Sequence, residues 1–152
     1  MPKWHRTEQM DGYAPDGAEI RVLVDRPQGA TRLSLAEALV PVGQRTAKVY
    51  HQTVYEEIWY FVQGVGTVHL HDPAQADEEV FAVEPGDAVL LKPGHGFWVE
   101  NTGPTALNFL CCGSPPWPGP EEAQPWPDGS QEPRANAPGL AQGARALVLR
   151  QA

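Results

Sequence analysis

Hydrophobic residues recur at every second position in the first part of the chain. In AEIRVLV, residues 18–24, the alternating set is Ile20, Val22 and Val24. A period of two residues is typical of a β-strand with one buried face. The preceding residues 1–17 are polar and interrupted by Gly and Pro, so we expect an arm there and a strand after it.

The next periodic stretch, TRLSLAEAL at residues 31–39, allows two interpretations. Leu33 and Leu35 share one face of a strand, whereas Leu-Ala-Glu-Ala-Leu also has good helix propensity. Pro41 and Gly43 end the stretch before it reaches a typical helix length. We therefore expect a strand, with a short helix as the alternative.

Short segments rich in β-branched and aromatic residues follow one another from residue 47 to residue 112. Gly and Pro turns separate them at intervals of roughly ten residues. These turns lie at residues 64–66, 72–73, 85–87, 93–94 and 103–104. No segment is long enough to supply the helix of a βαβ unit, so the pattern predicts a single all-β domain over residues 18–112, an antiparallel sandwich or barrel.

Residues 113–152 differ in composition and form a Pro-rich C-terminal extension. Eight of the 16 prolines lie within residues 115–138, and a segment so poor in backbone donors forms neither a helix nor a sheet ladder. Trp117 and Trp126 are unusual in a disordered linker, so we expect the first part of the extension to pack on the β-domain through Trp117. ARALVL, residues 144–149, could add an edge strand to the same chain or to a partner.

Charge and cysteine content restrict the partners and the compartment. The formal net charge is -8, from 11 basic and 19 acidic residues, which argues against nucleic acid and anionic membrane surfaces as partners. No apolar segment is long enough to span a bilayer, and the start of the chain lacks the apolar core of a signal peptide. Cys111 and Cys112 are adjacent, which implies no disulfide framework. We expect a cytoplasmic protein.

Residues 51–64 and 86–101 carry histidine, glutamate, glycine and asparagine at spacings that resemble the two motifs of the cupin family. The first family motif is written G-x5-H-x-H, then three or four residues, then E-x6-G. In HQTVYEEIWYFVQG, residues 51–64, His51, Glu57 and Gly64 match the first histidine, the glutamate and the closing glycine, whereas Thr53 replaces the second histidine. This resemblance implies a cupin jelly roll, a double-stranded β-helix barrel, for the β-domain.

The second family motif is written G-x5-P-x-G-x2-H-x3-N. In GDAVLLKPGHGFWVEN, residues 86–101, the matching residues are Gly86, Gly94 and Asn101. Phe97 stands at the histidine position. Both glycines and the asparagine of this motif are therefore present, whereas Lys92 stands at its proline position and a second metal ligand of the family is replaced. The opening glycine of the first motif departs as well, because Gly43 is two residues too far from His51.

The resemblance also bears on metal binding. In cupins three histidines and a glutamate from facing strands normally hold Fe, Mn, Ni or Zn, and here Thr53 and Phe97 occupy two of those four positions. A tight site for a first-row metal needs three or more protein ligands, so His51 and Glu57 alone should bind weakly. We expect no metal cofactor. If a divalent transition metal is bound, His95 is the predicted third ligand, swinging inward from a turn that otherwise exposes it to solvent.

Strand parity and the family geometry together predict a pocket inside the barrel. His51 and Glu57 would share a proton there and act as a catalytic acid/base pair, with a structural remnant of a lost metal site as the alternative. The predicted ligand-binding residues are Thr53, Trp59, Phe97 and Asn101.

Other polar residues are expected outside this pocket. His69 and His71 form an H-x-H pair that should point away from the core, more often into solvent than toward an adventitious metal. Glu56 should also face outward. Cys111 and Cys112 alternate on the last strand, so one of them should be buried.

Three hypotheses follow. The first is a metal-independent cupin that binds a small organic molecule, either as its whole function or in support of isomerase- or lyase-type proton transfer. The second is a metal-dependent cupin enzyme such as a dioxygenase. The third is a regulatory module that contacts a partner through its C-terminal extension. A homodimer is expected because an open jelly roll has edge strands to protect.

Overall fold

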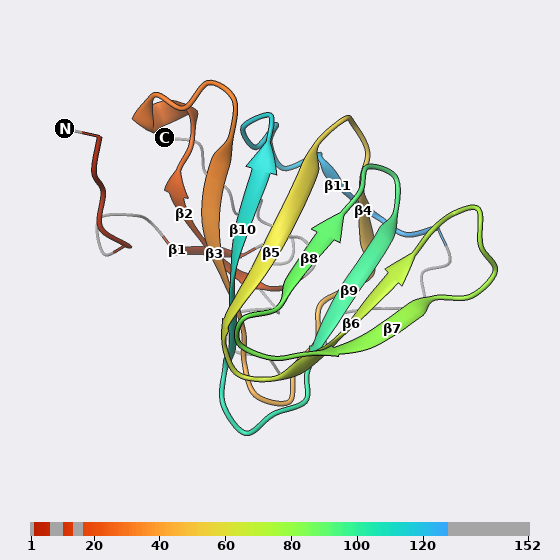
Figure 1. Ribbon diagram of the computed structural model, residues 1–152. Helices are drawn as coiled ribbons and strands as arrows, with labels where there is room; N and C mark the ends of the chain where they lie inside the picture. Colours follow the sequence, from red (N-terminus) through yellow and green to blue (C-terminus); the bar gives the residue numbers. More distant parts are fainter. Residues whose placement is uncertain (1, 7–10, 14–16, 128–152) are drawn as a thin grey trace.

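The computed structural model describes residues 2–6, 11–13 and 17–127 of the chain (Figure 1). It confirms an all-β jelly roll, built from two antiparallel sheets that face each other. Sheet A has the spatial order β1 (Asp11–Tyr13), β2 (Glu19–Val24), β3 (Ser34–Val40), β10 (Leu107–Ser114), β5 (Glu56–Gln63) and β8 (Ala88–Leu91). Sheet B has the order β11 (Ala123–Pro125), β4 (Val49–His51), β9 (Gly96–Asn101), β6 (Gly66–His71) and β7 (Glu79–Val83). A short 3-10 turn, η2 (Arg26–Gln28), follows β2.

The predicted two-residue alternation is clearest in β5. Glu57, Trp59 and Phe61 are buried between the sheets, whereas Ile58 and Tyr60 are 48% and 47% exposed on the outer face. Hydrogen bonds to β10 on one side and β8 on the other fix this register. The strand therefore delivers one carboxylate and two aromatic rings to the barrel interior.

The segment at residues 31–39, for which strand and helix were both considered, forms strand β3. It pairs with β2 on one side and β10 on the other, and these two ladders satisfy its backbone groups and override its local helix propensity. Leu33 precedes the strand and is 53% exposed, so the face it shares with Leu35 is not the buried one. The opposite face of β3 supplies three small residues to the wall of the internal cavity, Ser34, Ala36 and Ala38, and Leu35 also lines this cavity.

The core lies between the sheets and contains side chains from both. Phe61 of sheet A and Val68 and Val99 of sheet B are completely buried. Gly64 ends β5 with a φ of +81°, and a Cβ at that position would lie 2.4 Å from the carbonyl oxygen of Ala106. Only glycine fits this turn, which is the physical reason for the glycine that closes the first motif.

Both flanking segments contact the barrel. Within the expected N-terminal arm, β1 pairs with β2, and Arg6 forms an ion pair with Glu37 of β3. After β10 the chain crosses from sheet A to sheet B, where β11 pairs with β4. The first part of the extension is therefore packed, whereas the predicted edge strand at residues 144–149 lies outside the described residues. Among the residues that the structure describes, no helix is long and apolar enough to cross a membrane.

Candidate functional site: a cavity between the two sheets

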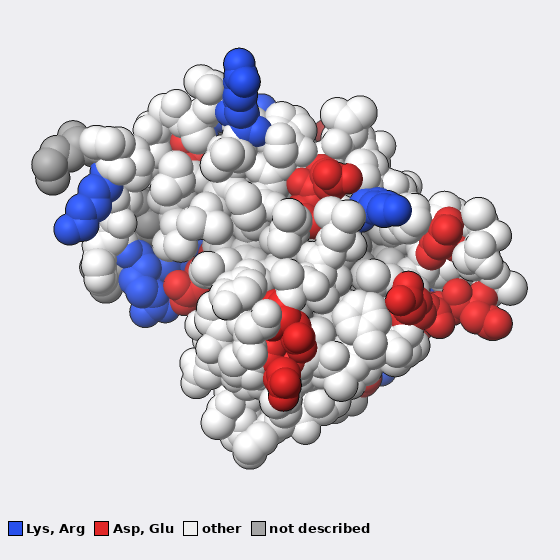
Figure 2. Space-filling view, in the orientation of Figure 1, with Lys and Arg blue, Asp and Glu red and all other residues white. Residues whose placement is uncertain are grey.

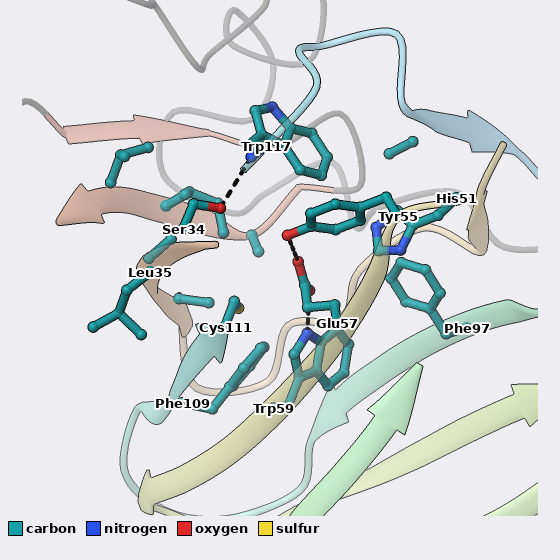
Figure 3. Close-up of a pocket in the computed structure, with 16 residues that line it drawn as sticks. Ser34, Leu35, His51, Tyr55, Glu57, Trp59, Phe97, Phe109, Cys111 and Trp117 are labelled. Carbon is teal, nitrogen blue, oxygen red and sulfur yellow. Dashed lines mark hydrogen bonds between the residues drawn. The ribbon is translucent and has the colours of Figure 1, made fainter. Parts of the chain in front are cut away.

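A cavity of about 70 Å³ lies inside the barrel between β2, β3, β5, β10 and the end of β4 (Figure 3). Most of its wall is apolar, from Ile20, Ala38, Trp59, Phe97 and Phe109 among others. Its polar lining residues are Ser34, His51, Tyr55 and Glu57. Since one water needs about 10–15 Å³ of such space, the cavity can hold a small ligand or several waters.

Glu57 projects from β5 into this wall and is 8% exposed. The Tyr55 hydroxyl donates to its Oε2 at 2.6 Å, and the Trp59 indole Nε1 donates to its Oε1 at 2.6 Å (Figure 3). These two donors, one on each oxygen, offset the cost of removing a carboxylate from water and fix its orientation. Burial, reinforced by the nearby Glu57 charge, raises the pKa of Tyr55 far above its usual value, so Tyr55 remains a donor.

His51 ends β4 and is 2% exposed. Its ring packs edge-on against Tyr55, with ring centroids 4.8 Å apart, and lies 4.9 Å from the ring of Phe97. The Nδ1 atom of His51 is buried and has no hydrogen-bond partner within the described chain. Burial lowers the pKa of His51 to about 4, so the imidazole is neutral at neutral pH.

The predicted proton-sharing pair of His51 and Glu57 is not formed. Both residues line the cavity, but Glu57 accepts its hydrogen bonds from Tyr55 and Trp59 rather than from His51. Tyr55 was not among the predicted site residues. It precedes Glu57 by two positions, so the alternation that placed Glu57 and Trp59 in the interior already indicated it.

Two of the four predicted ligand-binding residues line the cavity. Trp59 and Phe97 meet edge to face with ring centroids 5.4 Å apart. Trp59 also packs on Phe109 at 4.5 Å. The ring at the position of a family histidine is therefore part of an aromatic wall.

The structure does not bring Thr53 into the cavity. β4 ends at His51, so the alternation that linked the two residues stops there, and Thr53 is exposed outside the cavity. Its Oγ1 and backbone N donate to Oε1 of Glu122 at 2.6 and 3.1 Å. Thr53 thus contacts the C-terminal extension rather than a ligand in the barrel.

Asn101 is also placed outside the cavity wall. Asn101 is buried, but its Nδ2 donates to the carbonyl oxygens of Val40 and Thr105 at 2.9 and 2.8 Å. Its Oδ1 accepts from the backbone N of Gly103 at 3.0 Å. Because it lies at the opposite end of β9 from Phe97, it stabilises a turn and does not reach the cavity.

His95 does not join His51 and Glu57. It lies in the turn before β9, its side chain is 30% exposed, and its Nε2 is 4.0 Å from Oδ1 of Asp72. It lines a separate hollow of about 340 Å³, and the ring of Phe97 borders both spaces. His95 therefore keeps the partly exposed turn position, and its role as a third ligand when a metal is bound stays a prediction.

His69 and His71 point away from the barrel core, as predicted, but not into solvent. His69 stacks on Trp98 with ring centroids 3.6 Å apart, and its Nδ1 lies 3.2 Å from Glu78. The Nδ1 of His71 lies 2.8 Å from Nζ of Lys48. The outer face of sheet B carries its own layer of charged and aromatic side chains, which sequence alternation alone could not reveal.

Glu56 is exposed, Cys111 is buried and Cys112 is exposed, in agreement with strand parity.

The donor set does not fit the metal centre of the family. Phe97 offers no donor atom, Thr53 is hydrogen-bonded outside the cavity, and both oxygens of Glu57 accept hydrogen bonds from side chains. Within the described ranges, no three His, Cys, Asp or Glu residues are placed to hold a metal ion. The cavity is built for hydrogen bonding and apolar contact.

Comparison with solved structures shows the same fold. The chain superposes on the formate complex of Lactobacillus farciminis oxalate decarboxylase with a TM-score of 0.65 and 22% identity, over 74% of this chain and 32% of that one. For Bacillus subtilis oxalate decarboxylase, an enzyme with Mn(II) centres, the TM-score is 0.61 at 19% identity, over 70% of this chain and 28% of that one. The chain thus spans less than a third of the length of either enzyme, and the similarity concerns the fold.

Sequence comparison identifies the family. An uncharacterized protein of Methanocaldococcus jannaschii is 39% identical over 103 residues, which are 67% of this chain and 77% of that protein. The family model of the cupin domain matches residues 36–113. These residues include both motifs and most of the cavity wall, and the chain belongs to the cupin domain family.

Proposed function

We propose that this cupin binds a small, largely apolar organic molecule in the cavity, with His51 as its hydrogen-bonding group. The observation that carries the proposal is the buried, unpartnered Nδ1 of a neutral imidazole in an otherwise mostly apolar wall. A buried polar atom without a partner costs about 1–3 kcal/mol. A ligand that supplies a donor or an acceptor to His51 recovers that cost.

The size of the cavity restricts the ligand. A space of about 70 Å³ corresponds to a ligand of on the order of five to seven heavy atoms. Trp59 and Phe97 present ring faces and edges, which favour a flat or apolar body with one polar group. Phenol has this size and chemistry and serves as a first probe.

Binding is better supported than a proton relay. A neutral imidazole can accept a proton from a bound molecule, so the isomerase- or lyase-type activity would depend on His51. Glu57, held by Tyr55 and Trp59, would orient the cavity wall.

The cytoplasmic location stays a prediction.

The metal-dependent alternative requires a further ligand. Oxalate decarboxylase of B. subtilis has Mn(II) centres, and the fold is shared, but among the residues that the structure describes no third metal-binding side chain lies beside His51 and Glu57. Metal analysis of tag-free protein distinguishes the two functions. Stoichiometric metal that is lost in His51→Ala would favour the metal-dependent enzyme, whereas substoichiometric metal that is unaffected by His51→Ala supports metal-independent binding.

A cavity-filling variant tests the proposed function directly. Ala36 lines the cavity from β3, and Ala88 is exposed on β8 of the same sheet. We expect phenol to raise the melting temperature of the wild type and of Ala88→Leu, but not of Ala36→Leu, where the added side chain occupies the cavity. An equal response of Ala36→Leu would show that the ligand binds elsewhere and would refute the proposal.

A further inference from the structure

Residues 115–122 cross one end of the barrel outside the part of the chain that matches the cupin domain. They connect β10 of sheet A to β11 of sheet B, whereas the family match ends at residue 113. Trp117 lies in this segment and lines the cavity. Figure 3 shows its indole beside Tyr55 at the edge of the cavity, opposite the Trp59 side. The extension thus adds a wall that the matched domain does not supply.

We propose that Trp117 determines the size of the ligand, and that Thr53 and Glu122 position Trp117. This inference rests on the proposed function and adds the ligand's upper length limit. The Trp117 ring meets Tyr55 edge-on at 5.1 Å and His51 at 5.9 Å between centroids. A ligand bonded to His51 and extending away from Trp59 therefore meets the indole.

Hydrogen bonds on both sides hold the backbone of Trp117. Its N–H donates to Oγ of Ser34 at 3.0 Å, and its carbonyl oxygen accepts from Nη1 of Arg26 at 2.7 Å. Ser34 begins β3 and Arg26 lies in η2, so these two elements fix the backbone from which the indole projects. A fixed aromatic ring imposes a sharper size limit than a mobile one.

A second anchor lies on sheet B. Glu122 is 2% exposed, and its Oε1 accepts from both the Oγ1 and the backbone N of Thr53. The backbone N of Gln52 also donates to the carbonyl oxygen of Glu122 at 3.0 Å. Thr53, which stands at a metal-ligand position of the family motif, thus holds the crossing segment. With this segment in place, His51 remains only 2% exposed.

A series of 4-alkylphenols, from phenol to 4-butylphenol, tests the size limit by calorimetry. We expect wild-type affinity to fall at least tenfold between 4-methylphenol and 4-propylphenol. Trp117→Ala should bind 4-propylphenol at least tenfold more tightly than the wild type does, with phenol affinity changed less than threefold, while Trp117→Phe keeps the wild-type limit. The same limit in Trp117→Ala would overturn the inference and leave the proposed function standing.

A ligand-free measurement tests the positioning residues. Diethyl pyrocarbonate modifies accessible neutral imidazoles, and the rate at His51 relative to the partly exposed His95 reports on how often the segment opens. We expect the relative rate to rise at least fivefold in Thr53→Val, which loses the Oγ1 donor, and to stay at the wild-type value in Thr53→Ser. Thr102→Val, at an exposed threonine, controls for the substitution itself.

The two measurements separate the possible failures. Equal His51 labelling in Thr53→Val and Thr53→Ser, in variants shown by circular dichroism to be folded, would refute the positioning role. Failure of every phenol to bind either the wild type or Trp117→Ala would refute the proposed function and the size limit together. The labelling would then still decide whether residues 115–122 control access to His51.

Discussion

Glu57 shows how neighbours close in sequence can stabilise a buried charge. Tyr55 lies one residue before β5 and Trp59 lies within it, and each donates to one carboxylate oxygen of Glu57. The pleat of β5 places Glu57 and Trp59 on the same side, and Tyr55 reaches Glu57 from the end of the preceding loop. The carboxylate is consequently held in one orientation against the cavity.

The first prediction concerns this donor pair. Tyr55→Phe removes the hydroxyl donor and leaves Glu57 with one hydrogen bond fewer, so we expect a loss of about 1–3 kcal/mol in the free energy of unfolding. Urea denaturation at pH 7 measures this loss. Tyr60→Phe, at a 47% exposed tyrosine of the same strand, should change the free energy by less than about 0.5 kcal/mol. Equal effects of the two variants would contradict the role assigned to Tyr55.

The second prediction concerns the protonation of His51. Its pKa is lowered from 6.5 to about 4 in the folded protein, so the unfolded state binds the proton first as the pH falls. This shift has no effect on the free energy of unfolding well above pH 6.5, where the imidazole is neutral in both states, and it lowers that free energy by up to about 3 kcal/mol as the pH falls from 6.5 to 4. Urea denaturation at pH 7 and at pH 4.5 measures the loss.

His51→Phe is the reference for this titration, because it removes the imidazole while the other acid-sensitive groups remain. On acidification from pH 7 to pH 4.5, the free energy of unfolding should fall more for the wild type than for His51→Phe. A difference that does not depend on pH would show that His51 is not held neutral by burial.

The candidate site shows which residue-level inferences the sequence allows. His51, Glu57, Trp59 and Phe97 all line the cavity, because motif positions inside strands keep their parity. Thr53 does not line the cavity, because it lies beyond the end of β4, where strand parity no longer applies. The two-residue spacing indicates Tyr55 and Trp59 as neighbours of Glu57, but no local pattern specifies that a tryptophan 60 residues away in sequence completes the wall.

At the scale of elements, the outer face of sheet B holds a partly buried network of charges. Nζ of Lys48 lies 2.7 Å from Oε1 of Glu78, 2.8 Å from Nδ1 of His71 and 4.8 Å from the ring centre of Trp126. Burial raises the pKa of the Glu78 carboxyl, but its contacts with Lys48, Trp98 and His69 together outweigh burial and lower it. The network connects β6, the segment before β4 and the residue after β11.

The third prediction tests this connection. Lys48→Met leaves the carboxylate of Glu78 without its Lys48 contact, and because the Lys48 side chain is only 3% exposed we expect a loss of about 1–3 kcal/mol. Glu78 is 25% exposed, which keeps the loss below that of a fully buried pair. Lys92→Met, at an exposed lysine, is the matched control and should be nearly neutral in urea denaturation.

Elements were predictable where periodicity and turn residues coincided. β5 and the strands that follow it between Gly and Pro turns are examples. For β3, local sequence indicated a strand but also allowed a short helix, and the ladders to β2 and β10 explain why the strand forms. The crossing at residues 115–122 has no period at all, because its prolines remove backbone donors. Only its tryptophan indicated that it packs.

At the scale of the whole molecule, charge and apolar surface are unevenly distributed. Figure 2 shows acidic side chains in separate groups, with broad uncharged surface between them. On the outer face of sheet A, Arg6 from the N-terminal segment contacts β3. On β5 and β8 of the same face, Ile58, Tyr60 and Leu90 are 44–48% exposed. β8 is also the edge strand of this sheet. Exposed apolar side chains beside an open sheet edge favour association with another molecule.

The fourth prediction is that two copies of the chain associate through this region, in keeping with the homodimer expected from the sequence. Light scattering should give twice the chain mass of 16.6 kDa for the wild type. Ile58→Lys places a charge beside Leu90, its partner across the β5–β8 ladder, and should give the monomer mass. Val80→Lys changes an equally exposed residue on β7 of sheet B and should remain dimeric, because it lies away from the proposed contact. A monomer mass for the wild type would refute the dimer. Dissociation by Val80→Lys but not by Ile58→Lys would place the interface elsewhere.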